Sequence, residues 1–215
     1  MSIENDVLIL GQWLSPAFPV GAFAYSHGLE TAIQSGTISC ASDLEMWLGD
    51  VLEHGSGRND CILLRAAYQC DGPDALRDVN DIALAVSACA ERVFETQLQG
   101  AAFSKTSAAI WGSGTPDLCY PLAVGAAAAK QQLDVDLTAA FYLHAFTSNL
   151  VSAAVRAVPL GQTEGQKVLA ALTPLCQRIA RDSKTATLDD LSSTAFLSDI
   201  AAMQHETLQP RIFRS

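Results

Sequence analysis

The sequence lacks the short motifs by which catalytic sites are most often recognised. It has no phosphate-binding G-x-x-x-x-G-K-[ST] loop, since Gln166 stands directly before Lys167 in the most similar segment. It also has no G-x-S-x-G elbow and no H-E-x-x-H helix, because no second histidine follows His205-Glu206. We therefore expect a protein that is not an enzyme, with no catalytic residues and no resident cofactor.

The spacing of neighbouring metal ligands is missing too. His27, His54, His144 and His205 lie in separate segments, and no two of the six cysteines form a C-x-x-C pair. The cysteines, at positions 40, 61, 70, 89, 119 and 176, mostly lie in Ala- or Leu-rich stretches, where a thiol behaves as a small apolar group. We expect buried, reduced cysteines and assign no metal ligands, although distant segments could still assemble a site.

Basic residues are few. The chain has 13 Lys and Arg against 23 Asp and Glu, a formal net charge of -10. Its scattered cations offer no surface for phosphate backbones or anionic lipid, which argues against nucleic acid as a partner. Because Glu4 and Asp6 stand where a signal peptide would carry basic residues, we expect a cytoplasmic protein.

One stretch is long and nearly free of charge. Residues 137–155 carry no acidic or basic side chain except His144, and a membrane span needs a similar length. Thr138, Thr147 and Asn149 would be costly in hydrocarbon, whereas a protein interior can pair them. We expect a buried central helix there and no association with a membrane.

Apolar residues recur at intervals of three and four throughout the chain, and no stretch alternates long enough to require a strand. We predict an all-α fold, a single domain over residues 1–215 with a terminal helix and tail at about 195–215. A capping box at Ser42 should open the third helix, and Gly55 and Gly57 should end it. Helices are expected over 3–14, 25–35, 42–52, 59–70, from Pro73 onward, and over 91–111, 121–133, 137–158, 163–182 and 195–207. We expect loops at 15–19, 112–117 and 159–161, and a loose polar segment at 183–193.

Two segments favour recognition. Residues 14–30 place Phe18, Phe23 and Tyr25 beside two prolines, so a stiff turn either projects these aromatic groups or fastens the first helix to the second. The chain ends with Ile212 and Phe213 between two arginines, residue types that anchor interfaces. The alternatives for this tail are docking on its own domain or disorder.

Three further features have simple structural explanations. Glu91 and Glu95, with Arg92 between them, have the spacing of a solvated helix face. Asn149 is expected to brace the core, and Arg156 to cap the end of its helix, where the helix dipole favours a cation.

Four segments, in order, resemble signatures of the UreF family of urease accessory proteins. Residues 15–30 resemble the family's opening signature, 91–96 its central charged helix and 149–166 its Asn-to-Gly-Gln stretch. Residues 203–207 with 211–215 resemble its final signature, so the resemblance covers residues 8–215.

This resemblance implies an all-α homodimer that binds the accessory protein UreD, also called UreH, and the GTPase UreG on apo-urease. The complex would insert nickel, and the chain itself would hold no cofactor. The resemblance and the terminal pattern together assign partner-binding roles to Phe23, Tyr25, Ser26, His27, Glu30, His205, Glu206, Arg211, Ile212, Phe213 and Arg214.

We expect the tail and the polar segment before it to become ordered against UreD. Ordering would bury Ile212 and Phe213 and present a surface to GTP-bound UreG. Two other functions stay open. The chain could regulate GTP hydrolysis by UreG, with Arg211 or Arg214 acting on the phosphates, or it could bind nickel itself as a chaperone.

Overall fold

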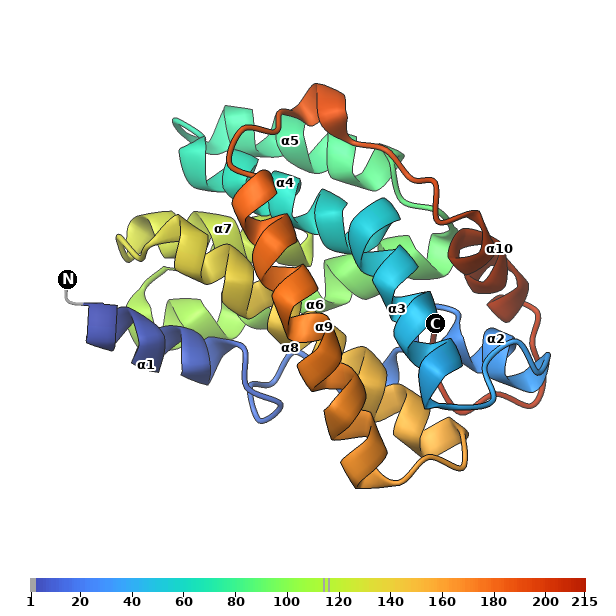
Figure 1. Cartoon of the computed structure of the whole chain (residues 1–215). Coiled ribbons are helices and arrows are strands. Elements are labelled where there is room, and N and C mark those ends of the chain that lie inside the picture. Colours follow the sequence, from blue (N-terminus) through green and yellow to red (C-terminus); the bar gives the residue numbers. More distant parts are fainter. Residues whose placement is uncertain (1–2, 114, 116) are drawn as a thin grey trace.

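The computed structural model describes residues 3–113, 115 and 117–215 and is built of helices (Figure 1). In chain order they are α1 (Ile3–Trp13), η1 (Ala22–Ala24), α2 (Leu29–Gln34), α3 (Ala41–His54), α4 (Ser56–Gln69), α5 (Pro73–Ala85), α6 (Ala90–Trp111), α7 (Tyr120–Lys130), α8 (Val135–Ala157), α9 (Gln162–Asp182), η2 (Leu188–Asp190) and α10 (Phe196–His205). No strand occurs in the described ranges, and the predicted all-α fold is confirmed.

Small residues bring α7 and α4 close together in the core. The Ala-rich sequence of α7 is buried from Pro121 to Ala128, since it carries few bulky side chains to hold a neighbour away. A Cβ added to Gly125 would lie 2.1 Å from the carbonyl oxygen of Leu64 in α4. The helix predicted at 137–158 is α8, which places Leu143 and Leu150 in the same core. Within the described part of the chain, no helix is long and apolar enough to cross a membrane.

Several predicted boundaries are wrong for local reasons. α2 begins at Leu29 instead of Tyr25, because His27 and Gly28 have positive φ angles that interrupt a helix. α3 begins before Ser42, since the Asp43 carboxylate accepts the N–H groups of Ser39 and Cys40. Gly57 lies inside α4 instead of ending a helix, and its missing side chain admits Leu52. Two positions of the loop predicted at 112–117, 114 and 116, lie outside the described residues.

The segment at 183–193 is not loose as predicted. The Arg65 side chain donates to Ser183 Oγ at 2.8 Å, and Arg58 donates to the carbonyl oxygen of Asp190 at 2.5 Å. The Ser192 N–H donates to Asn59 Oδ1 at 3.2 Å. These bonds fasten the segment along α4, and the segment then continues to α10.

The cysteines are all free, as expected, but they are not all buried. Cys61, Cys119 and Cys176 lie in the core, whereas Cys40 at the start of α3 is exposed. Cys40 departs from the prediction because it is the residue that precedes a surface helix, where its backbone carbonyl begins the helical ladder.

Candidate partner-docking site

The C-terminal segment, residues 211–215, lies against the opening loop, residues 14–28, of the same chain. The Arg214 N–H donates to the carbonyl oxygen of Ala24 at 2.8 Å, and the Ser26 N–H donates to that of Ser215 at 2.6 Å. Phe213 is buried, with 3% of its surface exposed. The chain reaches this place through α10, which lies next to α2 (Figure 1). Docking on its own chain, one of the alternatives named for the tail, is therefore what the structure has, and Phe213 is buried without the expected ordering against UreD.

Glu30 holds this segment by its backbone. It lies in the first turn of α2, directly after the left-handed Gly28 that turns the chain into the helix. Its carboxylate oxygens accept the N–H of Ile212 at 2.7 Å and the N–H of Phe213 at 2.9 Å. Glu30 is only 2% exposed, so these charge-assisted bonds form largely away from competing water.

Glu91 holds the same segment from the start of α6. Its Oε1 atom accepts from Arg211 at 2.5 Å, and its Oε2 atom lies 2.7 Å from Nδ1 of His205. The other ring nitrogen of His205 lies 3.2 Å from Glu30 Oε2. We call Glu30, Glu91, His205 and Arg211 the His205 cluster, and it joins α2, α6, α10 and the C-terminal segment. Glu206 adds to this junction by accepting the Ala90 N–H, the first of α6, at 2.9 Å.

A second group of charges lies one turn further along α6. The Arg92 guanidinium donates to Nδ1 of His27 at 2.7 Å and also contacts the carboxylate of Glu95, which accepts from Ser215 Oγ at 2.7 Å. Burial, the largest single influence, raises the pKa of Glu95, but the charge of Arg92 together with the contributions of His27 and Ser215 outweighs burial and brings the pKa to about 2. Burial, and then Arg92, lower the pKa of His27, so its ring is neutral at pH 7 and accepts from Arg92.

The solvated-face interpretation of these α6 residues is consequently wrong. Glu95 is 4% exposed, and Glu91 and Arg92 are partly buried, because the opening loop and the C-terminal segment cover this side of α6. The i, i+4 spacing of Glu91 and Glu95 directs both carboxylates toward the same two segments.

Arg156 near the end of α8 connects the loop to the segment. Its guanidinium donates to the carbonyl oxygen of Phe23 at 2.6 Å and lies 4.7 Å from the centre of the Phe213 ring. A cation over an aromatic face is attracted by the ring quadrupole. The predicted capping role accounts for only one contact, the bond from Arg156 to the Ser152 carbonyl oxygen.

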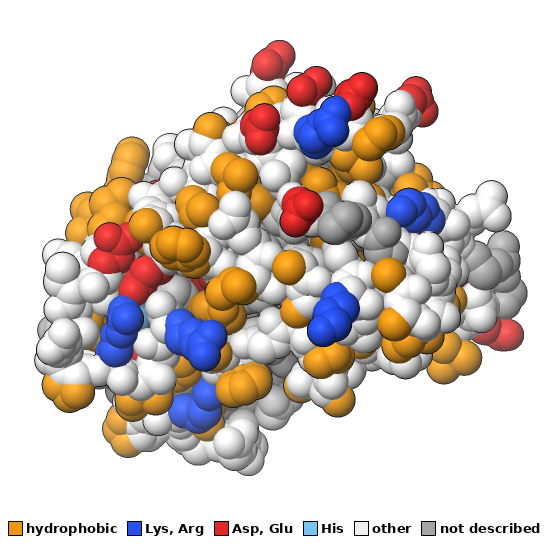
Figure 2. All heavy atoms as spheres, turned by 180° about the vertical axis from the view of Figure 1, so that it is seen from behind, with side chains coloured by type: hydrophobic (Ala, Val, Ile, Leu, Met, Phe, Trp, Pro, Cys, Tyr) orange, Lys and Arg blue, Asp and Glu red, His pale blue; other side chains and the backbone are white. Residues whose placement is uncertain are grey.

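Large apolar side chains are exposed around the docked segment. Phe23 is 70% exposed, Phe94 63%, Leu98 52% and Ile212 72%. Phe23, Leu98 and Ile212 border a shallow groove together with Arg156 and Arg214. Figure 2 shows basic side chains set close together among hydrophobic ones at the left of the rear face, the side on which α2 and α10 lie. We call Phe23, Phe94, Leu98, Ile212 and Arg214 the docking face.

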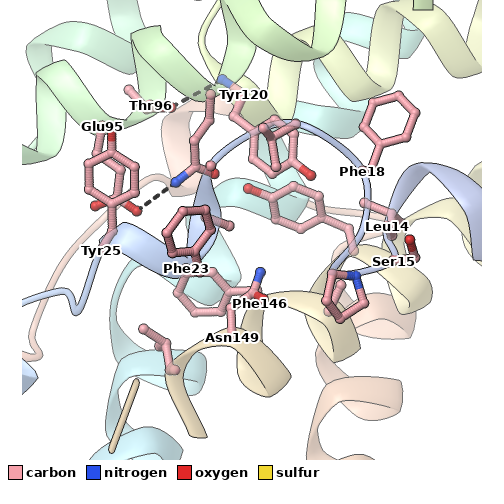
Figure 3. Close-up of a pocket in the computed structure, with 18 of the residues that line it drawn as sticks. Leu14, Ser15, Phe18, Phe23, Tyr25, Glu95, Thr96, Tyr120, Phe146 and Asn149 are labelled. Carbon is pink, nitrogen blue, oxygen red and sulfur yellow. Dashed lines mark hydrogen bonds between the residues drawn. The ribbon is translucent and has the colours of Figure 1, made fainter. Parts of the chain in front are cut away.

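Beneath the opening loop lies a cavity of about 210 Å³, lined by aromatic and ionisable side chains. Figure 3 shows Phe146 and Asn149 of α8 on one side of it and Tyr120 of α7 on another. Asp60 lines it too, and burial raises the pKa of this carboxyl to about 6 although Tyr142 donates to it at 2.7 Å. The cavity supports the loop from below and does not gather metal ligands: no three His, Cys, Asp or Glu residues of the described ranges come together as such a site requires.

Phe18 shows which alternative applies to the aromatic residues of the loop. Its ring packs 5.5 Å from that of Phe103 and 6.4 Å from that of Trp111, measured between ring centres. Phe18 therefore fastens the loop to α6, whereas Phe23 points into solvent with 70% of its surface exposed. The predicted projection of aromatic groups applies to Phe23, whereas the predicted fastening of the first helix to the second is not what Phe18 does, because its ring partners Phe103 and Trp111 lie in α6.

Comparison with known proteins gives the family. The UreF family model matches residues 38–173. The urease accessory protein UreF of Ruegeria pomeroyi is 53% identical over 212 residues, covering 99% of this chain and 98% of its own length. Its counterpart in Roseobacter denitrificans is 55% identical over 208 residues, covering 97% of this chain and 93% of its own. The chain belongs to the UreF family. The resemblance found in the sequence is thereby confirmed, and the chain is a urease accessory protein of this family.

The eleven residues predicted for partner binding in this UreF-family chain all lie at the junction of loop, α2, α10 and tail, in two groups. Those exposed are Phe23, Glu206, Arg211, Ile212 and Arg214. Those buried are Tyr25, Ser26, His27, Glu30, His205 and Phe213, and most of these hold the docked segment. Only the first group can touch a partner while the segment stays docked.

Glu91, Arg92, Glu95 and Arg156 belong to the same site but were not predicted to. Their spacing along α6 and α8 is what an ordinary exposed helix face shows, and the partners that tie them to the loop and the tail, such as His27 for Arg92 and Phe213 for Arg156, lie 57 or more positions away. One signal was available in the sequence: His205 and Arg211 near the chain end can pair with carboxylates, and Glu91 stands in the first turn of α6.

Proposed function

We propose that this chain is a non-catalytic scaffold for urease maturation, and that its docking face binds another accessory protein of the complex. The observation that carries the proposal is the docking face itself. Large apolar side chains that stay exposed next to one another mark interaction sites in soluble proteins. Aromatic, isoleucine and arginine side chains also contribute strongly when an interface buries them.

The charge of the docking face supports the same proposal. The chain as a whole has a formal net charge of -10, yet Arg156 and Arg214 border this groove. Neither forms an ion pair with a carboxylate in the described part of the chain. A locally positive face on an acidic protein favours a partner whose contact surface is apolar and acidic.

Membership of the UreF family supports a proposal for the partners. We propose that the chain binds UreD (UreH), then UreG, and assembles with them on apo-urease for nickel insertion, acting as a homodimer in the cytoplasm. Nickel is the cargo of this complex, and we propose no resident cofactor for the chain. The absence of a three-ligand cluster among the described residues gives the nickel-chaperone alternative no support.

Truncating Phe23 should weaken the complex with UreD. Phe23 is the most exposed aromatic side chain of the docking face, so we expect Phe23→Ala to raise the dissociation constant by about 30-fold, the effect of losing about 2 kcal/mol at an interface anchor. Titration calorimetry on purified proteins measures it. Met46→Ala is the matched control, because Met46 is 67% exposed on α3. Equal affinities for Phe23→Ala and the unmodified chain would refute the docking face.

GTP hydrolysis separates the scaffold from a regulator that supplies an arginine. Arg211 is already bound to Glu91, whereas the exposed Arg214 pairs with no carboxylate in the described ranges and is the better candidate for contact with phosphates. As a scaffold, the chain with Arg214→Ala should leave UreG turnover within about twofold once the complex has formed. A loss of about 10³-fold, the size of an arginine-finger effect, would favour the regulator instead.

A further inference from the structure

His205 occupies an unusual position for a histidine. Its side chain is completely buried, and each ring nitrogen faces a glutamate oxygen, Glu91 Oε2 at 2.7 Å and Glu30 Oε2 at 3.2 Å. An ionised carboxylate can only accept hydrogen bonds, and a neutral imidazole has one N–H and one lone pair. Both bonds can therefore form together only when the ring carries two protons.

The groups around the ring favour the protonated form. The charged groups that face His205 are the carboxylates of Glu30 from α2 and Glu91 from α6, and Arg211 of the C-terminal segment lies on the other oxygen of Glu91. Two carboxylates thus meet one guanidinium and one imidazole. The cluster is balanced when His205 is a cation and carries an excess negative charge in a buried place when it is not.

The same two carboxylates hold the C-terminal segment. Glu30 accepts the N–H groups of Ile212 and Phe213, and Glu91 accepts from Arg211. When His205 loses a proton, a ring lone pair faces one of these carboxylates at hydrogen-bond distance, and the complete burial of the ring keeps bulk solvent from screening the repulsion. The carboxylates must then shift, and the bonds to the segment shift with them.

We propose that His205 is a proton-dependent latch that holds residues 211–215 against the opening loop when doubly protonated and loosens them when it loses a proton. The docked state binds one proton more than a state in which the ring faces water as a neutral imidazole. Docking is therefore stronger at pH 6 than at pH 8.

The latch itself does not depend on the proposed function; only its effect on partner binding rests on that proposal. Arg214 and Ile212 belong to the docking face, so releasing the segment would dismantle part of the surface offered to a partner. The latch thus makes the partner-binding surface of the chain dependent on pH. The segment itself can be followed in the chain alone, and the outcome does not depend on whether any partner binds.

Amide hydrogen exchange on the full chain tests the proposal. We expect the protection factors of the Ile212 and Phe213 amides to fall about tenfold from pH 6 to pH 8, the loss of one charge-assisted hydrogen bond. Protection factors already correct for the intrinsic effect of pH on exchange. His144→Gln, which removes the exposed histidine of α8, should keep the full pH dependence.

Two variants distinguish a latch from a general effect of pH. His205→Gln should have weak protection that is the same at both pH values. Glu91→Gln should fold and flatten the dependence, because an amide can donate to or accept from a neutral ring. Equal protection of the unmodified chain at pH 6 and 8, or an undiminished pH dependence in Glu91→Gln, would overturn the proposal. Neither result would bear on the Phe23→Ala test of the docking face.

Discussion

Glu30→Gln should release the C-terminal segment while the helical core stays folded. The substitution keeps the size of the side chain but replaces one acceptor oxygen by an N–H₂ group, so the N–H of either Ile212 or Phe213 faces another donor. It also removes a negative charge beside His205. Breaking a buried ionic network by changing one member typically costs about 3 to 5 kcal/mol. We expect docking of the segment to weaken by at least 100-fold.

Hydrogen exchange and chemical unfolding together measure this effect. The amides of residues 212–215 should lose their protection, whereas the exchange of core amides in α4 and α7 should change little. Glu45→Gln is the matched control, since Glu45 is exposed on α3 and far in sequence from the segment. If the amides of Ile212 and Phe213 stay as protected as before, Glu30 does not hold the segment and the assignment of the site is wrong.

The fold could largely be predicted because its helices follow local signals. α6 ends at Trp111 before a left-handed Gly112, and α9 begins after Gly161, as glycine patterns indicate. The errors arose where tertiary contacts decide. Nothing in the sequence around His27 shows that this non-glycine residue adopts a φ of 56°, because the hydrogen bond that accompanies the conformation comes from Arg92 of α6, far along the chain.

The site was predicted only in part, because some of its residues have local signals and others depend on tertiary contacts. Ile212 and Phe213 stood out because apolar residues in a polar tail are conspicuous, and both lie at the site. The structure gives the two residues different roles: Phe213 is buried against its own chain, whereas Ile212 is exposed. Glu91 and Glu95 were interpreted as solvated because the spacing of residues within one helix does not reveal which distant segments cover it. In the structure, residues 24–30 and 205–215 fold back over α6. Burial of a charge is a tertiary property, and a single helix carries no sign of it.

Gly28→Ala should detach α10 from α2. Gly28 has a φ of +75°, and a Cβ added there would lie 2.5 Å from the backbone nitrogen of Ala202 and 2.8 Å from the carbonyl carbon of Ala201. Because both contacts are with backbone atoms, no side-chain rotation can relieve them, and α10 must move away. His205 lies one turn after Ala202, so moving α10 also separates the His205 ring from Glu30 and Glu91.

Gly21→Ala isolates the steric part of this effect. Gly21 has the same φ of +75°, but a Cβ there would meet nothing within 4 Å. Both substitutions incur the cost of a left-handed alanine, about 1 to 2 kcal/mol. Only Gly28→Ala adds the cost of overpacking, about 1 to 3 kcal/mol, together with the loss of the His205 bonds. We therefore expect the amides of α10 and residues 212–215 to exchange at least 30-fold faster in Gly28→Ala than in Gly21→Ala. Equal exchange in the two variants would mean that backbone strain alone matters and that close packing of α10 on Gly28 does not position the docked segment.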